Sequence, residues 1–111
     1  DHIALADSVW EITRHFQGPM RFVLAGSGHI AGVVNPPAAG KYQYWTNDAP
    51  TDTLDEFVAG ATETKGSWWP YWLGWLRDQN AEMVPAEGAR VPGGGSLPAI
   101  EDAPGRYVRE R

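Results

Sequence analysis

The stretch RFVLAGSGHIAGVVNPP, residues 21–37, joins a short apolar run to a glycine-rich segment that contains one histidine. The run Phe22–Ala25 lies between two glycine-containing turns and is too short for a lasting helix, so it predicts a buried β-strand over residues 21–25. We expect it to be the only strand of this chain. Because a buried strand must pair its backbone groups with neighbours, we also expect the rest of its sheet to lie outside these residues.

About three helices are predicted around this strand. An amphipathic helix should precede it, because four apolar residues recur at helical spacing: Leu5, Val9, Ile12 and Phe16. Further along, Thr53 followed three residues later by Glu56 is typical of a capping box that opens a second helix. Ser67 is expected to cap a third helix, in which Pro70 falls in the tolerated first turn.

Two other regions are expected to lack regular structure. Residues 26–50 are rich in glycine, proline, asparagine and aspartate and predict a long loop that carries the histidine. Residues 81–111 contain repeated prolines and glycines and predict an extended tail. The sequence therefore divides into residues 1–80 and this tail.

Composition excludes several classes of function. The net charge is −5, and the nine lysines and arginines are scattered, so no nucleic acid or anionic membrane surface is expected as a partner. The absence of cysteine excludes a disulfide, a thiolate metal site and a thiol nucleophile within this chain. We find no apolar run long enough for a membrane span, no signal peptide, no metal-ligand spacing and no phosphate-binding motif. No metal or cofactor-binding residue is therefore predicted, and a cytoplasmic setting is expected.

Among the three histidines, His29 has the context most typical of catalysis. It follows the predicted strand and is flanked by glycines that let a substrate approach the backbone closely. Histidine is also the side chain most often used as a general base. A structural or surface role stays open on this context alone. His15 lies on the polar side of the first helix, and we interpret His2, beside Asp1, as structural.

Several segments resemble class I polyhydroxyalkanoate synthases. DHIALADSVW (1–10) is similar to the acid-bearing motif of that family and residues 21–37 to its histidine motif, and three further segments are similar to it: WTND (45–48), GSWWPYW (66–72) and APGRYVRER (103–111). The order of the segments and the 28-position interval from Asp1 to His29 agree with the family pattern. The family usually has proline and tryptophan where this chain has Leu5 and Ala6, so the loop after Asp1 departs from the family pattern. Residues 84–98 match no segment of the family.

The resemblance implies an α/β fold in which residues 1–80 are the C-terminal part of an α/β-hydrolase catalytic domain. It implies a Cys–His–Asp triad with His29 as general base and Asp1 as the acid, the cysteine lying upstream in a Gly-x-Cys-x-Gly elbow. The family order of nucleophile, acid and histidine is that of α/β-hydrolases. Asp1 either orients His29 or activates the 3-hydroxyl group of the incoming unit, and the sequence does not decide between these roles.

The implied activity is polymerisation of (R)-3-hydroxyacyl-coenzyme A into a polyester with release of coenzyme A. The thioester is a substrate, and no cofactor is implied. The growing polyester is a second partner, and the family implies a homodimer at the surface of cytoplasmic polyhydroxyalkanoate granules. On this interpretation the chain begins within a fold and is inactive alone.

Two alternatives remain. A serine esterase or depolymerase of the same fold would share the Asp and His but carry serine in the elbow. A non-catalytic module for binding a polymer is suggested by six tryptophans in 111 residues. Four of these lie between Trp68 and Trp75, and at helical spacing we interpret them as packing a helix onto a sheet. The carboxylates of residues 52–56 are interpreted as favouring a helix N-terminus and not as a metal site.

Overall fold

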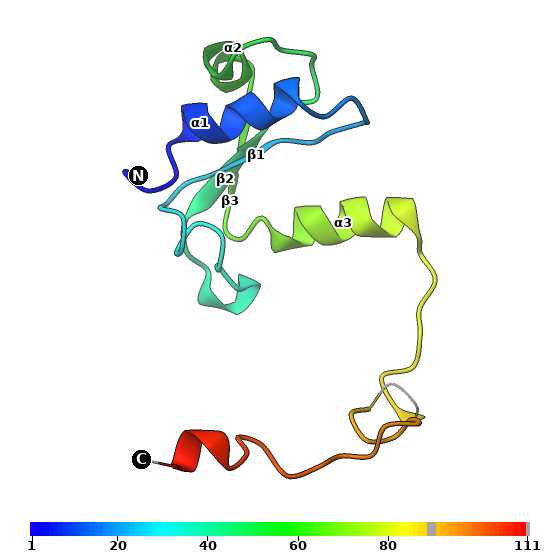
Figure 1. The fold of residues 1–111 in the computed structure, drawn as a ribbon. Coiled ribbons are helices and arrows are strands. Elements are labelled where there is room, and N and C mark those ends of the chain that lie inside the picture. The colour runs from blue at the N-terminus through cyan, green and yellow to red at the C-terminus, as the bar shows by residue number, and fades with distance from the viewer. Residues whose placement is uncertain (89–90, 111) are drawn as a thin grey trace. The chain divides into compact units, whose positions relative to one another are not determined.

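The computed structural model describes residues 1–88 and 91–110, which form two compact units, Asp1–Gln79 and Asn80–Arg111. The first unit contains three α-helices and three strands: α1 (Ala6–Trp10), β1 (Val23–Ala25), β2 (Gln43–Thr46), α2 (Leu54–Ala59), β3 (Thr62–Lys65) and α3 (Trp69–Gln79) (Figure 1). The described residues of the second unit form mainly turns and bends and include the 3₁₀ turn Tyr107–Arg109. Of the predicted extended tail, residues 89, 90 and 111 lie outside the described residues.

The sheet is antiparallel, with strand order β1-β2-β3. The prediction of a single strand was therefore wrong, and so was that of an irregular loop throughout residues 26–50, because β2 lies inside it. Both missed strands lack an apolar alternation: β2 reads QYWT, and β3, TETK, is exposed along its whole length. Such strands form by pairing with a neighbour and leave little signal of their own. The prediction of an α/β class is confirmed at the level of a small sheet with helices.

Helices pack on opposite faces of this sheet (Figure 1). On one face, Trp10 of α1, Phe57 of α2 and Phe22 form a cluster with ring centroids 4.9–5.5 Å apart. On the other face, Tyr44 of β2 lies against Tyr71 of α3, with centroids 6.0 Å apart. Trp10, Phe57 and Tyr44 are the buried apolar side chains among the described residues. The core of the first unit is thus aromatic and small.

The first helix is present, but it buries a different face from the one its apolar pattern predicts. After α1 the chain continues as a 3₁₀ helix, Glu11–Arg14. The four residues of the predicted stripe are all exposed in this chain, to between 45% and 60%: Leu5, Val9, Ile12 and Phe16. Trp10 is buried in their place, because its ring fits between Phe22 and Phe57. The apolar stripe of this helix therefore has no partner among the described residues.

The predicted helix starts are confirmed. At α2, Thr53 Oγ1 accepts the backbone N–H of Glu56 at 3.2 Å, and Glu56 Oε2 accepts that of Thr53 at 3.3 Å. This is the reciprocal capping box. At α3, Ser67 Oγ accepts the backbone N–H of Trp69 at 3.1 Å. These side chains satisfy backbone donors that have no partner within the first turn of a helix.

In the part of the chain that the structure describes, no helix has the length and apolar character needed to cross a membrane.

Candidate functional site

Asp1 and His29, the two residues predicted to act together, are in contact. Oδ2 of Asp1 lies 2.8 Å from Nδ1 of His29, and Oδ1 lies 3.1 Å from the same nitrogen. Asp1 precedes α1, while His29 follows β1, so the fold brings together positions 28 residues apart. The imidazole is 38% exposed, whereas the carboxylate is only 16% exposed. One member of the pair is open to an incoming group, and the other is largely covered.

The carboxylate of Asp1 is held by backbone groups as well. Its Oδ2 accepts the backbone N–H of His29, and its Oδ1 accepts those of Ile3 and Ala4 at 2.9 and 3.4 Å. Hydrogen bonds from N–H groups favour the ionised form of a carboxylate. They also fix its orientation toward the ring, because they tie both oxygens to the main chain. Backbone groups next to Asp1 and at His29 therefore both hold the carboxylate in place.

This geometry sets the chemistry available to His29. An ionised carboxylate has no proton to donate, so the neutral ring must carry its proton on Nδ1 to form the bond with Asp1. Nε2 then carries the lone pair of the ring. A carboxylate–imidazole pair in this tautomer can accept a proton at Nε2 and return it, which is the role of a general base.

The segment after β1 forms a tight turn that carries His29. The N–H of Gly32 donates to the carbonyl of Gly28 at 2.7 Å, and the N–H of Val34 donates to that of Ile30 at 2.7 Å. Gly32 leaves no room for a side chain, since a Cβ there would lie 2.6 Å from the carbonyl oxygen of Ser27. Gly32 thus permits close packing of the turn itself.

A cavity of about 250 Å³ adjoins the pair. Its lining combines the two site residues with β1 and part of α1, and includes Asp1, His29, Val23, Ala25, Val9 and Val33. Ser27 also lines the cavity, and the remaining walls are mostly apolar, as is usual for a ligand pocket.

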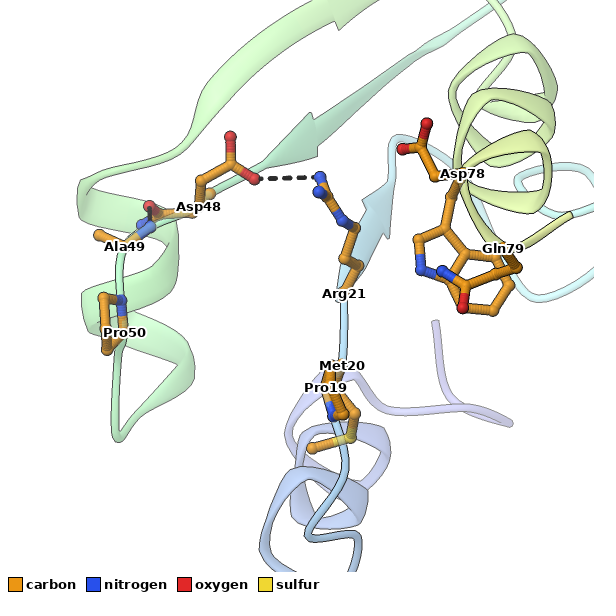
Figure 2. Close-up of a pocket in the computed structure, with 10 residues that line it drawn as sticks. Pro19, Met20, Arg21, Asp48, Ala49, Pro50, Asp78 and Gln79 are labelled. Atoms are coloured by element: carbon orange, nitrogen blue, oxygen red, sulfur yellow. Dashed lines mark hydrogen bonds and ion pairs between the residues drawn. The ribbon is translucent and has the colours of Figure 1, made fainter. Parts of the chain in front are cut away.

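Arg21 lies at a second cavity, of about 580 Å³, that contains neither Asp1 nor His29. Figure 2 shows its guanidinium directed toward Asp48, at 3.3 Å, with Asp78 on α3 nearby. It also donates to the hydroxyl of Tyr71 at 3.1 Å. The hydrogen bond and charge of Tyr71, and then the charges of Asp48 and Asp78, raise the pKa of Arg21 above its ordinary value. Arg21 therefore links the segment before β1 to α3, and we assign it a structural role.

The other histidines lie outside the site. His2 and His15 are exposed, and neither side chain makes a hydrogen bond among the described residues. No cluster of His, Cys, Asp or Glu in residues 1–88 and 91–110 has the arrangement of a metal site. Sequence reasoning missed one contact: the indole N–H groups of Trp68 and Trp69 both donate to the carbonyl of Val33, in the turn that carries His29. No sequence pattern signals such a bond.

Comparison with known proteins identifies relatives over the whole chain. The chain is 54% identical over 111 residues to the poly(3-hydroxyalkanoate) polymerase subunit PhaC of Rhizobium meliloti (strain 1021) and 46% identical to that of Cupriavidus necator. It is 53% identical over 110 residues to the poly(3-hydroxyalkanoate) polymerase of Methylorubrum extorquens. It covers 18% of the length of each of these three proteins. No protein-family model matches the chain. The resemblance to polyhydroxyalkanoate synthases is thereby confirmed.

Proposed function

We propose, from its similarity along its whole length to poly(3-hydroxyalkanoate) polymerases, that this chain supplies the base and the acid of a thiol-dependent acyltransferase. The reaction is polymerisation of (R)-3-hydroxyacyl-coenzyme A into a polyester. His29 is the general base and Asp1 is its carboxylate partner. The thiol nucleophile is contributed from outside these residues, which contain no cysteine.

The observation that supports this assignment is the contact between Oδ2 of Asp1 and Nδ1 of His29 at 2.8 Å. A histidine that only packed against its surroundings would have no need of a carboxylate held by three backbone N–H groups. The exposure of the ring beside a mostly apolar cavity also suits a base that must meet a substrate.

The proposed cycle has two balanced steps. In the first, Nε2 of His29 takes the proton of the thiol, and the thiolate attacks the carbonyl carbon of the substrate thioester. The bond from that carbon to the sulfur of coenzyme A breaks, and coenzyme A leaves as a thiol with the proton from His29. In the second, His29 takes the proton of a 3-hydroxyl group, whose oxygen attacks the enzyme-bound acyl group. An ester bond forms as the bond from the acyl carbon to the enzyme sulfur breaks, and His29 returns its proton to that sulfur, so no cofactor is needed.

We further propose that the sheet belongs to an α/β-hydrolase fold and continues beyond β1. In the described part of the chain β1 pairs with β2 alone, so its other side is a free edge. The exposed apolar residues of the first helix, such as Leu5 and Phe16, are suited to cover polypeptide packed at that edge. We also propose that a polymerase containing this chain forms a homodimer at the surface of cytoplasmic granules.

A chimera tests the proposal. This chain replaces the aligned segment of the Rhizobium meliloti polymerase subunit, and release of coenzyme A from (R)-3-hydroxybutyryl-coenzyme A is measured together with the polyester formed. The chimera should be active, and His29→Ala should lower kcat by about 10³-fold or more. His15→Ala, a change at an exposed histidine, is the matched control and should retain activity.

Three results would count against the proposal. A folded chimera without polymerase activity would contradict the function, and a His29→Ala variant with near-normal release of coenzyme A would contradict the general-base role. Hydrolysis of esters through a serine, with no polymer formed, would favour the esterase instead.

A further inference from the structure

We propose that Trp68 and Trp69 are positioning residues for the proposed general base, holding the turn that carries His29 through a shared carbonyl group. Their indole Nε1 atoms lie 3.0 and 2.9 Å from the carbonyl oxygen of Val33. A carbonyl oxygen has two lone pairs and can accept both bonds. This inference rests on the proposed function of His29.

The backbone explains why the carbonyl of Val33 needs donors from elsewhere. Residues 28–34 form a helical turn, in which the N–H of Gly32 donates to the carbonyl of Gly28. If this turn continued, the carbonyl of Val33 would accept an N–H three or four residues later. Those positions are Pro36 and Pro37, which have no backbone N–H. The two prolines therefore end the turn and leave its last acceptor free for the indoles.

With the two indole bonds to Val33, the turn that carries His29 is attached at both ends. At its start, Asp1 accepts the backbone N–H of His29, and just before it the N–H of Gly26 donates to the carbonyl of Gln43 at 2.8 Å. At its end, the pair of indoles holds Val33, and the buried side chain of Asn35, directly after the turn, donates its Nδ2–H to the carbonyl of Lys41 at 3.0 Å. Asn35 bonds only to the loop that follows, so loss of both indole bonds would remove the attachment of the His29 turn to α3.

The tryptophans are themselves on a fixed element. They lie at the start of α3, and Tyr71 of this helix packs against Tyr44 in the sheet and accepts a hydrogen bond from Arg21. A network of contacts thus connects the sheet, α3 and the His29 turn. Because catalytic groups need to be held within about 0.5 Å of the productive geometry, such an attachment affects turnover without touching the substrate.

The test uses phenylalanine, which keeps an aromatic ring in place but removes the indole donor. Trp68→Phe, Trp69→Phe and the double variant are made in the chimera. Trp75→Phe is the matched control, since it is on the same helix and makes no hydrogen bond to Val33. The double variant should lower kcat by about tenfold while KM changes by less than about twofold. Each single variant should lose less, about threefold, because the carbonyl keeps one donor.

A spectroscopic measurement tests the same proposal without activity. In ¹⁵N-histidine-labelled chimera, the Nδ1–H proton of His29, assigned by its loss in His29→Ala, should be sharp, and it should broaden in the double variant but not in Trp75→Phe. If the chimera with intact tryptophans is folded but inactive, the proposed function fails. The Nδ1–H signal still decides whether the two tryptophans hold the turn that carries His29.

An unchanged kcat and an unchanged Nδ1–H signal in the folded double variant would overturn the inference. So would a rise in KM alone, which would mean that the tryptophans contact substrate. Should the double variant not fold, normal kcat in both single variants would overturn it equally.

Discussion

Oδ2 of Asp1 lies 2.8 Å from Nδ1 of His29, and the backbone N–H of His29 donates to the same carboxylate. Asp1 therefore holds both the ring and the main chain of His29. With Ile3 and Ala4 donating to its other oxygen, little of the carboxylate is left for a second partner. This arrangement favours a role in orienting His29 over direct activation of a substrate hydroxyl.

Asp1→Asn in the chimera separates these two roles. An amide that turns its NH₂ toward the ring would favour the tautomer with the proton on Nε2, which cannot act as a base. If Asp1 orients His29, the first release of coenzyme A should slow by about 10³-fold to 10⁴-fold, along with steady-state turnover. Rapid mixing with substrate measures this first release. A normal first release followed by arrested elongation would instead indicate that Asp1 acts on the hydroxyl. Asp102→Asn, an exposed aspartate in the second unit, is the control.

The sequence predicted those elements that carry their own local signals. Thr53 and Glu56 form the capping box that their spacing indicates, and the apolar run ending at Ala25 forms a strand. β2 and β3 could not be predicted, because their stability comes from pairing and not from an apolar alternation of their own. The buried face of the first helix could not be predicted either, because Trp10 is buried through contacts with rings that are distant in sequence.

For the candidate site, sequence reasoning proposed the two residues but not the groups that hold them in place. Asp1 and His29 were proposed from their context and family resemblance, and the structure adds their contact. The backbone N–H groups that donate to Asp1 belong to residues next to it and to His29, and their directions depend on the local backbone conformation there. The indole bonds to Val33 join positions 35 and 36 residues apart, which no local pattern encodes.

Gly32→Ala should disturb the turn that carries His29. The added Cβ would lie 2.6 Å from the carbonyl of Ser27 and 2.9 Å from that of Gly28, so the backbone itself must shift. We expect a loss of about 1–3 kcal/mol in the free energy of unfolding of the chain, measured with urea, and reduced turnover in the chimera. Gly74→Ala in α3 meets nothing within 4 Å and should raise stability by about 0.5–1 kcal/mol. Equal effects of the two changes would contradict the packing argument.

Phe57→Ala should be among the most damaging changes to the first unit. Phe57 is 2% exposed and packs against both Trp10 and Phe22. Its removal should lower the free energy of unfolding by about 3–5 kcal/mol, through lost burial and the cavity left behind. Val58→Ala, at a neighbouring position that is 49% exposed, should change it by less than about 0.5 kcal/mol. Urea titration followed by tryptophan fluorescence provides the measurement, and a Phe57→Ala effect as small as that of the control would refute this description of the core.

Hydrogen exchange at β1 tests whether the sheet continues beyond this chain. Gly26 donates its N–H to Gln43 on β2, so the alternation of an antiparallel pair directs the N–H of Leu24 toward β2 as well. The N–H groups of Val23 and Ala25 then face the free edge. In the 111-residue chain these two amides should exchange quickly, while that of Leu24 is protected. In the chimera, a strand paired at this edge should slow both by about 100-fold or more, since their exchange would then require opening of the sheet. Fast exchange of Val23 and Ala25 in an active chimera would mean that β1 is a true edge and that the proposed α/β-hydrolase sheet does not extend from it.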